Sequence, residues 1–165
     1  MNKISLFIMC CSQAIHRSIS VIFASEKIFE VVGSAVGSAD AVSEVQRIQP
    51  DSIIYEKKPG ENISGIIKSI KQACPYTKVF VLVEDGNSDD LYDILSSEVD
   101  GCLSRSMLPR DLVKVVELAC LSGIICMPGF LKRYFAGQNP AFLMSIRDND
   151  IEVKQSESNN LLPKK

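Results

Sequence analysis

The fold of this chain is decided by the stretch TKVFVLV, residues 77–83, which ends in five consecutive apolar side chains. An apolar run of this length without alternation is typical of a strand that is covered on both faces of its sheet. The turn-forming residues Asp85, Gly86 and Asn87 follow it directly. The stretch therefore predicts the centre of a parallel sheet with helices on both sides.

The flanking sequence alternates between strand-like and helix-like patterns. The predicted strands are residues 4–10, 29–33, 51–55, 77–83 and 101–103. The predicted helices are residues 14–23, a helix capped by Ser38 that ends before Pro50, residues 63–74, a helix capped by Ser88 or Asp89, and residues 109–121 before Gly123. Residues 33–37 are expected to form a strand-to-helix turn, and residues 57–60 a solvated loop.

Five strand–helix units predict a flavodoxin-like, doubly wound (βα)5 parallel sheet with strand order 2-1-3-4-5 and helices on both faces. In such a sheet, the functional site lies at the carboxyl ends of the strands. Residues 1–124 are expected to form this domain and residues 125–137 to include a short C-terminal helix. Residues 138–165 are polar and are expected to be a linker or a disordered tail.

Composition and charge narrow the class of protein. The 165 residues are 46% hydrophobic, which is ordinary for a globular protein, and their formal net charge of -2 gives no support for nucleic-acid binding. No stretch approaches the ~20 apolar residues of a membrane span. Because the apolar N-terminal run is short and no cleavage site follows it, we interpret it as a strand and expect a cytoplasmic protein.

The cysteines are expected to be buried and reduced. They are Cys10, Cys11, Cys74, Cys102, Cys120 and Cys126, most of them within apolar runs and with no CxxC spacing. Cys10 and Cys11 form a vicinal pair, so a redox or metal role is the alternative interpretation. No histidine, cysteine or carboxylate lies at ligand spacing from this pair.

Several phrases of the sequence, in their order and spacing, resemble a response-regulator receiver domain. They are FEVVG (29–33), PDSIIYE (50–56), PG (59–60), TKVFVLV (77–83), VDGCLSR (99–105) and LPRDL (108–112). The resemblance covers about residues 3–135. It is greatest to the class of two-component regulators that carry a LuxR/NarL-type helix-turn-helix behind the receiver.

The resemblance implies where a phosphorylation site would lie. In this family an acidic pair binds Mg²⁺, an Asp accepts the phosphoryl group, and a Ser or Thr and a Lys complete the pocket. On this chain these positions fall on Cys10 and Cys11, on Glu56, on Val83 and on Arg105. Counted back from Pro59, the acceptor position falls on Tyr55 instead.

The residues at these positions do not suit phosphoryl transfer. Mg²⁺ prefers carboxylate oxygens, which neutral thiols do not replace, and without the metal the transferred charge loses its main stabiliser. Val83 cannot donate a hydrogen bond. We expect no bound metal and no cofactor, and a pair between Glu56 and Arg105 that holds the pocket shut. The sequence leaves open whether Glu56 mimics a phosphoryl group or fills an inert pocket.

We therefore expect a pseudo-receiver that is not an enzyme. It would be the regulatory part of a transcription regulator, or equally a stand-alone adaptor, and would signal by protein contact or dimerisation without aspartyl phosphorylation. The expected interface is the face of the fourth helix, fifth strand and fifth helix, with Leu91, Tyr92, Leu95, Leu103, Leu112, Val113 and Val116. DNA would be bound only through a separate output domain. The alternative is a flavodoxin-like domain that senses a small ligand or redox state through Cys10 and Cys11.

Overall fold

The computed structural model describes residues 2–37, 40–84 and 89–123, with the backbone alone for residues 89–92. The strands are β1 (Ile4–Cys10), β2 (Phe29–Val36), β3 (Ser52–Glu56), β4 (Lys78–Val83) and β5 (Gly101–Ser104). The helices are α1 (Gln13–Ala24), α2 (Ala41–Ile48), α3 (Ser64–Ala73), α4 (Asp89–Ser96) and α5 (Pro109–Ser122). The predicted alternation of strands and helices is confirmed.

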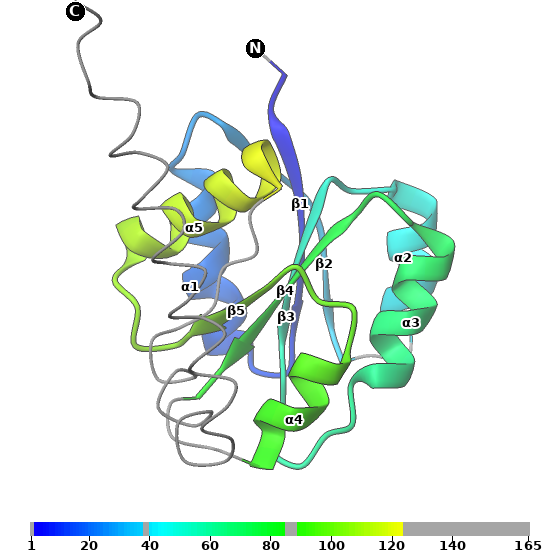
Figure 1. Ribbon diagram of the computed structural model, residues 1–165. Helices are drawn as coiled ribbons and strands as arrows, with labels where there is room; N and C mark the ends of the chain where they lie inside the picture. Colours follow the sequence, from blue (N-terminus) through cyan, green and yellow to red (C-terminus); the bar gives the residue numbers. More distant parts are fainter. Residues whose placement is uncertain (1, 38–39, 85–88, 124–165) are drawn as a thin grey trace, which may run out of the picture. The chain divides into compact units, whose positions relative to one another are not determined.

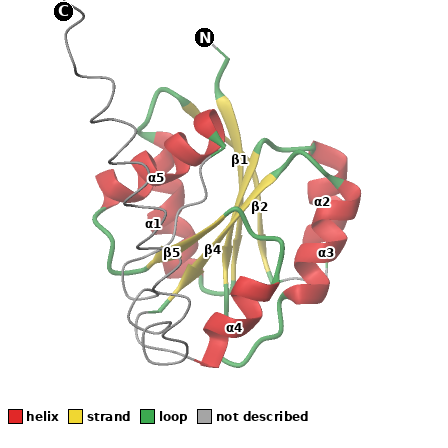
Figure 2. Cartoon of the chain, viewed as in Figure 1, coloured by secondary structure: helices red, strands yellow, loops and turns green. Residues whose placement is uncertain are grey.

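The strands form one parallel sheet in the order β2-β1-β3-β4-β5, as predicted. Figure 1 shows α1 and α5 on one face of this sheet and α2 and α3 on the other. Figure 2 gives the same view by secondary structure, with the strands as the middle layer. Since all strands are parallel, the loops that follow β1, β3 and β5 meet at one edge of the sheet.

The strands in the middle of the sheet are buried on both faces. In β1, alternate residues Leu6, Ile8 and Cys10 pack in the core cluster that includes residues of α1 and α5. Phe7 and Met9, which lie between them, are also buried, at 0% and 1% exposed. This two-sided burial explains why β1 and β4 have nearly continuous apolar sequences rather than alternating ones.

Strand β2 differs from its predicted form. It was expected to end at Gly33 but continues to Val36, so the predicted turn over residues 33–37 is wrong for most of its length. The pairing of β1 with β2 shifts register between Leu6 and Phe7, and Phe7 then lies opposite Gly33. A Cβ atom on Gly33 would lie 2.8 Å from the Phe7 ring. The glycine is therefore needed for close packing within the strand and does not end it.

The ends of α2 and α5 test the predicted helix boundaries. Helix α2 begins at Ala41 with Asp40 as its N-cap residue, and the predicted cap, Ser38, lies outside the described residues. Helix α5 begins at Pro109 and ends at Ser122, and the next residue, Gly123, has a left-handed φ of 67°, as expected of a glycine after a helix. The short helix and the tail expected after residue 124 lie outside the described ranges. Among the helices described, none combines the length and apolar character of a bilayer-spanning segment.

Candidate functional site

Glu56 is a buried carboxylate at the carboxyl edge of the sheet. It is the last residue of β3, the strand between β1 and β4, and its side chain is 1% exposed. The backbone N–H groups of Cys11 and Ser12 donate to its Oε2 over 2.9 and 3.2 Å. The carboxylate of β3 thus binds the loop that joins β1 to α1.

This contact satisfies the N–H of the N-cap residue of α1 and places a negative charge at the start of that helix. Ser12 is the N-cap residue of α1, but its side chain makes no capping hydrogen bond, and no acidic residue lies in the first turn. The first N–H groups of a helix need acceptors, and a negative charge near them is favourable. Glu56 provides both from a distant part of the chain. The sequence pattern of α1 alone did not reveal this role.

Arg105 supplies the positive charge next to Glu56. It follows directly after β5, and its backbone N–H donates to the carbonyl of Val83 over 3.0 Å. Its Nη2 donates to Glu56 Oε1, so the pair expected from the sequence is present in the structure. The Arg105 side chain is 30% exposed, whereas that of Glu56 is 1% exposed. The carboxylate is therefore neutralised inside the protein by a cation that still reaches solvent.

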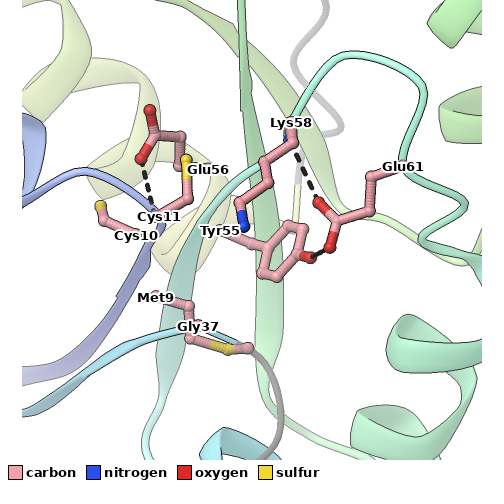
Figure 3. Close-up of a pocket in the computed structure, with 8 residues that line it drawn as sticks. All are labelled: Met9, Cys10, Cys11, Gly37, Tyr55, Glu56, Lys58 and Glu61. Carbon is pink, nitrogen blue, oxygen red and sulfur yellow. Dashed lines mark hydrogen bonds between the residues drawn. The ribbon is translucent and has the colours of Figure 1, made fainter.

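A small pocket lies beside this ion pair. Figure 3 shows Glu56 next to Cys10 and Cys11 on one side, with Tyr55 and Glu61 on the other. Met9, Gly37 and Lys58 complete the lining described. The pocket has a volume of about 20 Å³, which is room for about one water molecule. It is too small for a nucleotide or another organic cofactor.

Tyr55 lines the same pocket as Glu56 but has different hydrogen-bond partners. Its hydroxyl donates to Glu61 Oε1 over 2.7 Å, and Glu61 also accepts from the N–H of Lys58 over 3.1 Å. Burial, followed by the hydrogen bond to Glu61, raises the pKa of the Tyr55 hydroxyl. Of the two residues considered for the acceptor position, Glu56 is the one joined to Arg105 and to the start of α1.

The residues at the other predicted positions, Val83 and the two cysteines, lie at the carboxyl ends of β4 and β1 and carry no charge. Val83 is 5% exposed at the end of β4 and pairs in register with Ser104 of β5. Burial, and then the neighbouring Glu56, raises the pKa of the Cys10 thiol to about 12. Burial and the hydrogen bond to Glu56 also raise the pKa of Cys11. Both thiols are protonated at neutral pH, which disfavours thiolate chemistry and metal binding.

No group of three or more metal-ligating side chains occurs within the described ranges. Cys10, Cys11, Cys74, Cys102 and Cys120 are free thiols, and three of them (Cys10, Cys74 and Cys102) are buried. The sixth cysteine, Cys126, lies outside the part of the chain that the structure describes.

Lys57 is more deeply buried than the sequence predicted. The loop over residues 57–60 was expected to be solvated, but Lys57 is 4% exposed. Its Nζ donates to the carbonyls of Lys58 and Glu61. The main-chain carbonyls of the loop that follows β3 thus provide acceptors for the buried ammonium. A lysine in a Pro-Gly loop gives no sequence signal for such burial.

The predicted interface is contradicted at four of its seven residues. Leu103, Leu112, Val113 and Val116 are 0–4% exposed and belong to the core cluster with β1 and α1. Their helical spacing reflects packing within the domain, so they are not available to a partner. Leu95 is half-buried. The side chains of Leu91 and Tyr92 lie outside the description.

Comparison with known proteins finds solved structures with a similar fold. No protein-family model matches the chain. RcsB, a response regulator of Salmonella typhimurium, superposes with a TM-score of 0.71 at 22% identity, over 82% of this chain and 67% of that one. A LuxR-family two-component response regulator from Aurantimonas gives a TM-score of 0.72 at 14% identity, over 83% and 98%.

The chain has the fold of a response-regulator receiver domain. The resemblance found in the sequence is thus confirmed at the level of the fold. A curated relative, the transcriptional regulatory protein DegU of Brevibacillus brevis, is 27% identical over 128 residues, which are 77% of this chain. The match spans 54% of the length of DegU.

Proposed function

We propose that this chain is an atypical receiver domain, the regulatory part of a transcription regulator, that signals without aspartyl phosphorylation. The observation that carries the proposal is the buried Glu56 carboxylate, which already accepts from Arg105 and from the N–H groups of Cys11 and Ser12. Arg105 neutralises the charge that Mg²⁺ would otherwise balance. The pocket is therefore held closed by an ion pair within the protein itself.

The residues next to Glu56 support the same proposal. At the end of β1, where the family has its metal-binding acids, this chain has two thiols with raised pKa. Protonated thiols are poor ligands for Mg²⁺, which prefers oxygen. Val83, at the position of the hydroxyl residue, cannot donate to a phosphoryl oxygen. The raised pKa of both thiols also disfavours the alternative of a redox domain based on Cys10 and Cys11.

The output belongs to this proposal as well. DegU is named a transcriptional regulatory protein, and RcsB has been described as dimers bound to DNA. We propose that this domain acts through contact with a protein partner or a second copy of itself, in the cytoplasm, and that DNA is bound by a separate output domain. A signalling role of this kind involves no catalysis by this chain.

The proposed contact face is now on α5 and uses other side chains than the sequence suggested. Leu118 and Leu121 of α5 are 50% and 60% exposed. They replace the buried residues that the sequence suggested for this face. Exposed leucines spaced three residues apart on one helix suit contact with a partner.

The proposal is tested with beryllofluoride, a phosphoryl analogue that needs Mg²⁺ and an accepting carboxylate. The amide resonances of Cys11, Ser12 and Arg105 are followed by NMR while MgCl₂ and then beryllofluoride are added to the full chain. We expect no change at these three amides beyond that caused by matched ionic strength. Saturable shifts confined to them would show a working metal and phosphoryl site and would refute the proposal.

A further inference from the structure

A groove lies between α1 and α5 and reaches β4 and β5 of the sheet. It has a volume of about 300 Å³. Leu82 of β4 and Leu112 of α5, at 3% and 4% exposed, lie at its base together with Ile19 of α1. Ile15 and Ile22 of α1 line it and are partly exposed. Sites for small organic molecules have volumes of about 300–1,000 Å³ and are mostly apolar.

The groove has a polar end. Of the described lining residues, Arg105 is the one charged side chain, and it is a cation. Both α1 and Arg105 follow the carboxyl ends of parallel strands, so Arg105 lies at the edge of the sheet where α1 begins. The apolar residues Ile15, Ile19 and Ile22 continue from that end along α1 for about 10 Å, at a rise of about 1.5 Å per residue.

We propose that this groove binds a small carboxylate with an apolar body, with its head group at Arg105 and its body along Ile15, Ile19 and Ile22. A guanidinium has five N–H donors in a planar fork that matches a carboxylate. The described contact with Glu56 uses Nη2 alone. The described lining of the groove contains one cation and no acid, so it favours an anionic head group. The isoleucines favour an apolar chain.

The position of Arg105 connects the groove with the Glu56 pocket. Its side chain lines the groove and is also the partner of Glu56. A bound carboxylate is a second acceptor for the same guanidinium and weakens its hold on Glu56. A small molecule thereby takes the place of phosphorylation as the input to this receiver fold. This signalling consequence rests on the proposed function, whereas binding in the groove does not.

Isothermal titration calorimetry of the full chain tests the binding with three probes of equal chain length: decanoate, 1-decanol and decylamine, each below its micelle concentration. Decanoate is expected to bind about 10-fold more tightly than decanol, which corresponds to about 1.4 kcal/mol, and decylamine more weakly than either. Glu56→Gln is expected to bind decanoate more tightly than wild type, because its guanidinium has lost an anionic partner. Equal affinities for the three probes, or no binding of decanoate, would overturn the proposal.

Two variants of α1 locate the site. Ser18 is exposed and lines the groove, so Ser18→Phe should fill it and abolish decanoate binding. Val21 is 70% exposed and is not among the lining residues, so Val21→Phe adds a ring to the same helix and should bind as wild type does. Equal binding by both variants would place the ligand elsewhere and refute the groove.

An NMR measurement on the wild type locates the bound decanoate without relying on these variants. Decanoate should shift the NMR amides of Ile15, Ser18 and Ile22 but not that of Tyr76, which is 95% exposed outside this groove. Shifts at Tyr76 without shifts on α1 would contradict the assignment. This experiment contains no Mg²⁺ and no phosphodonor, so its result does not depend on whether Glu56 can be phosphorylated. Phosphorylation of Glu56 would refute the proposed function but not the binding of decanoate in the groove.

Discussion

Replacing Glu56 by Gln is expected to destabilise the fold by about 2–3 kcal/mol, because an amide cannot satisfy both groups of donors. If its oxygen faces the N–H groups of Cys11 and Ser12, its NH₂ group points at Arg105. If the amide group is flipped, its oxygen accepts from Arg105, but the two backbone N–H groups have no acceptor. Loss of a hydrogen bond to a charged group costs about 1.5–3 kcal/mol, and breaking a fully buried pair costs about 3–5 kcal/mol. The Arg105 side chain is 30% exposed, so water can hydrogen-bond to it when Glu56 is replaced. The expected loss therefore lies below the cost of breaking a fully buried pair.

The measurement is equilibrium urea unfolding followed by circular dichroism, with the free energy of unfolding extrapolated to water. Glu44→Gln is the matched control, because Glu44 also pairs with an arginine, Arg47, over 2.8 Å, but the two side chains are 47% and 70% exposed. This exposed pair should contribute less than ~1 kcal/mol. A double-mutant cycle with Arg105→Met should then give a coupling energy of about 1 kcal/mol or more. A Glu56→Gln effect within ~0.5 kcal/mol of wild type would refute the buried ion pair.

Three further predictions concern packing, metal binding and association. Gly33→Ala should lower the free energy of unfolding by about 1–3 kcal/mol, because the added methyl group meets Phe7 and Ile48. The control Gly65→Ala in α3, with open space around its Cβ, should not destabilise the fold, and equal effects of the two in urea unfolding would contradict the close packing. The double variant Cys10→Asp/Cys11→Asp should lose about 2–4 kcal/mol in EDTA and recover part of it in Mg²⁺, and stability that does not respond to Mg²⁺ would count against this view of the pocket. Wild type should self-associate in sedimentation velocity, and Leu118→Glu/Leu121→Glu should be monomeric with unchanged unfolding. A wild type that stays monomeric at high concentration would exclude self-association through this face.

The sequence predicted the fold well where burial is two-sided. Strands β1 and β4 have continuous apolar runs because helices cover both faces of the sheet, and this pattern is visible without a structure. Strand β2 lies at the edge of the sheet and is partly exposed, so its sequence carries a weaker signal. Gly33 resembled a chain break but is required by the approach of the Phe7 ring.

The site was predictable only in part. Glu56 ends β3 and Arg105 directly follows β5, and parallel strands bring such residues to one edge, so their pairing could be inferred. The capping of α1 by Glu56 could not, because the donors are backbone N–H groups, which every residue except proline carries. The apolar spacing of Leu112, Val113 and Val116 indicated a buried face, but periodicity does not tell a domain's own core from a partner.

The central claim, that this receiver fold does not use aspartyl-type phosphorylation, is tested most directly by intact-mass spectrometry after incubation with acetyl phosphate and Mg²⁺. A receiver domain that is known to be phosphorylated is treated in parallel as the positive control. We predict that the chain keeps its unmodified mass, because Glu56 is held by Arg105 and by the N–H groups of Cys11 and Ser12. The addition of one phosphoryl group, absent from Glu56→Ala treated in the same way, would contradict this account.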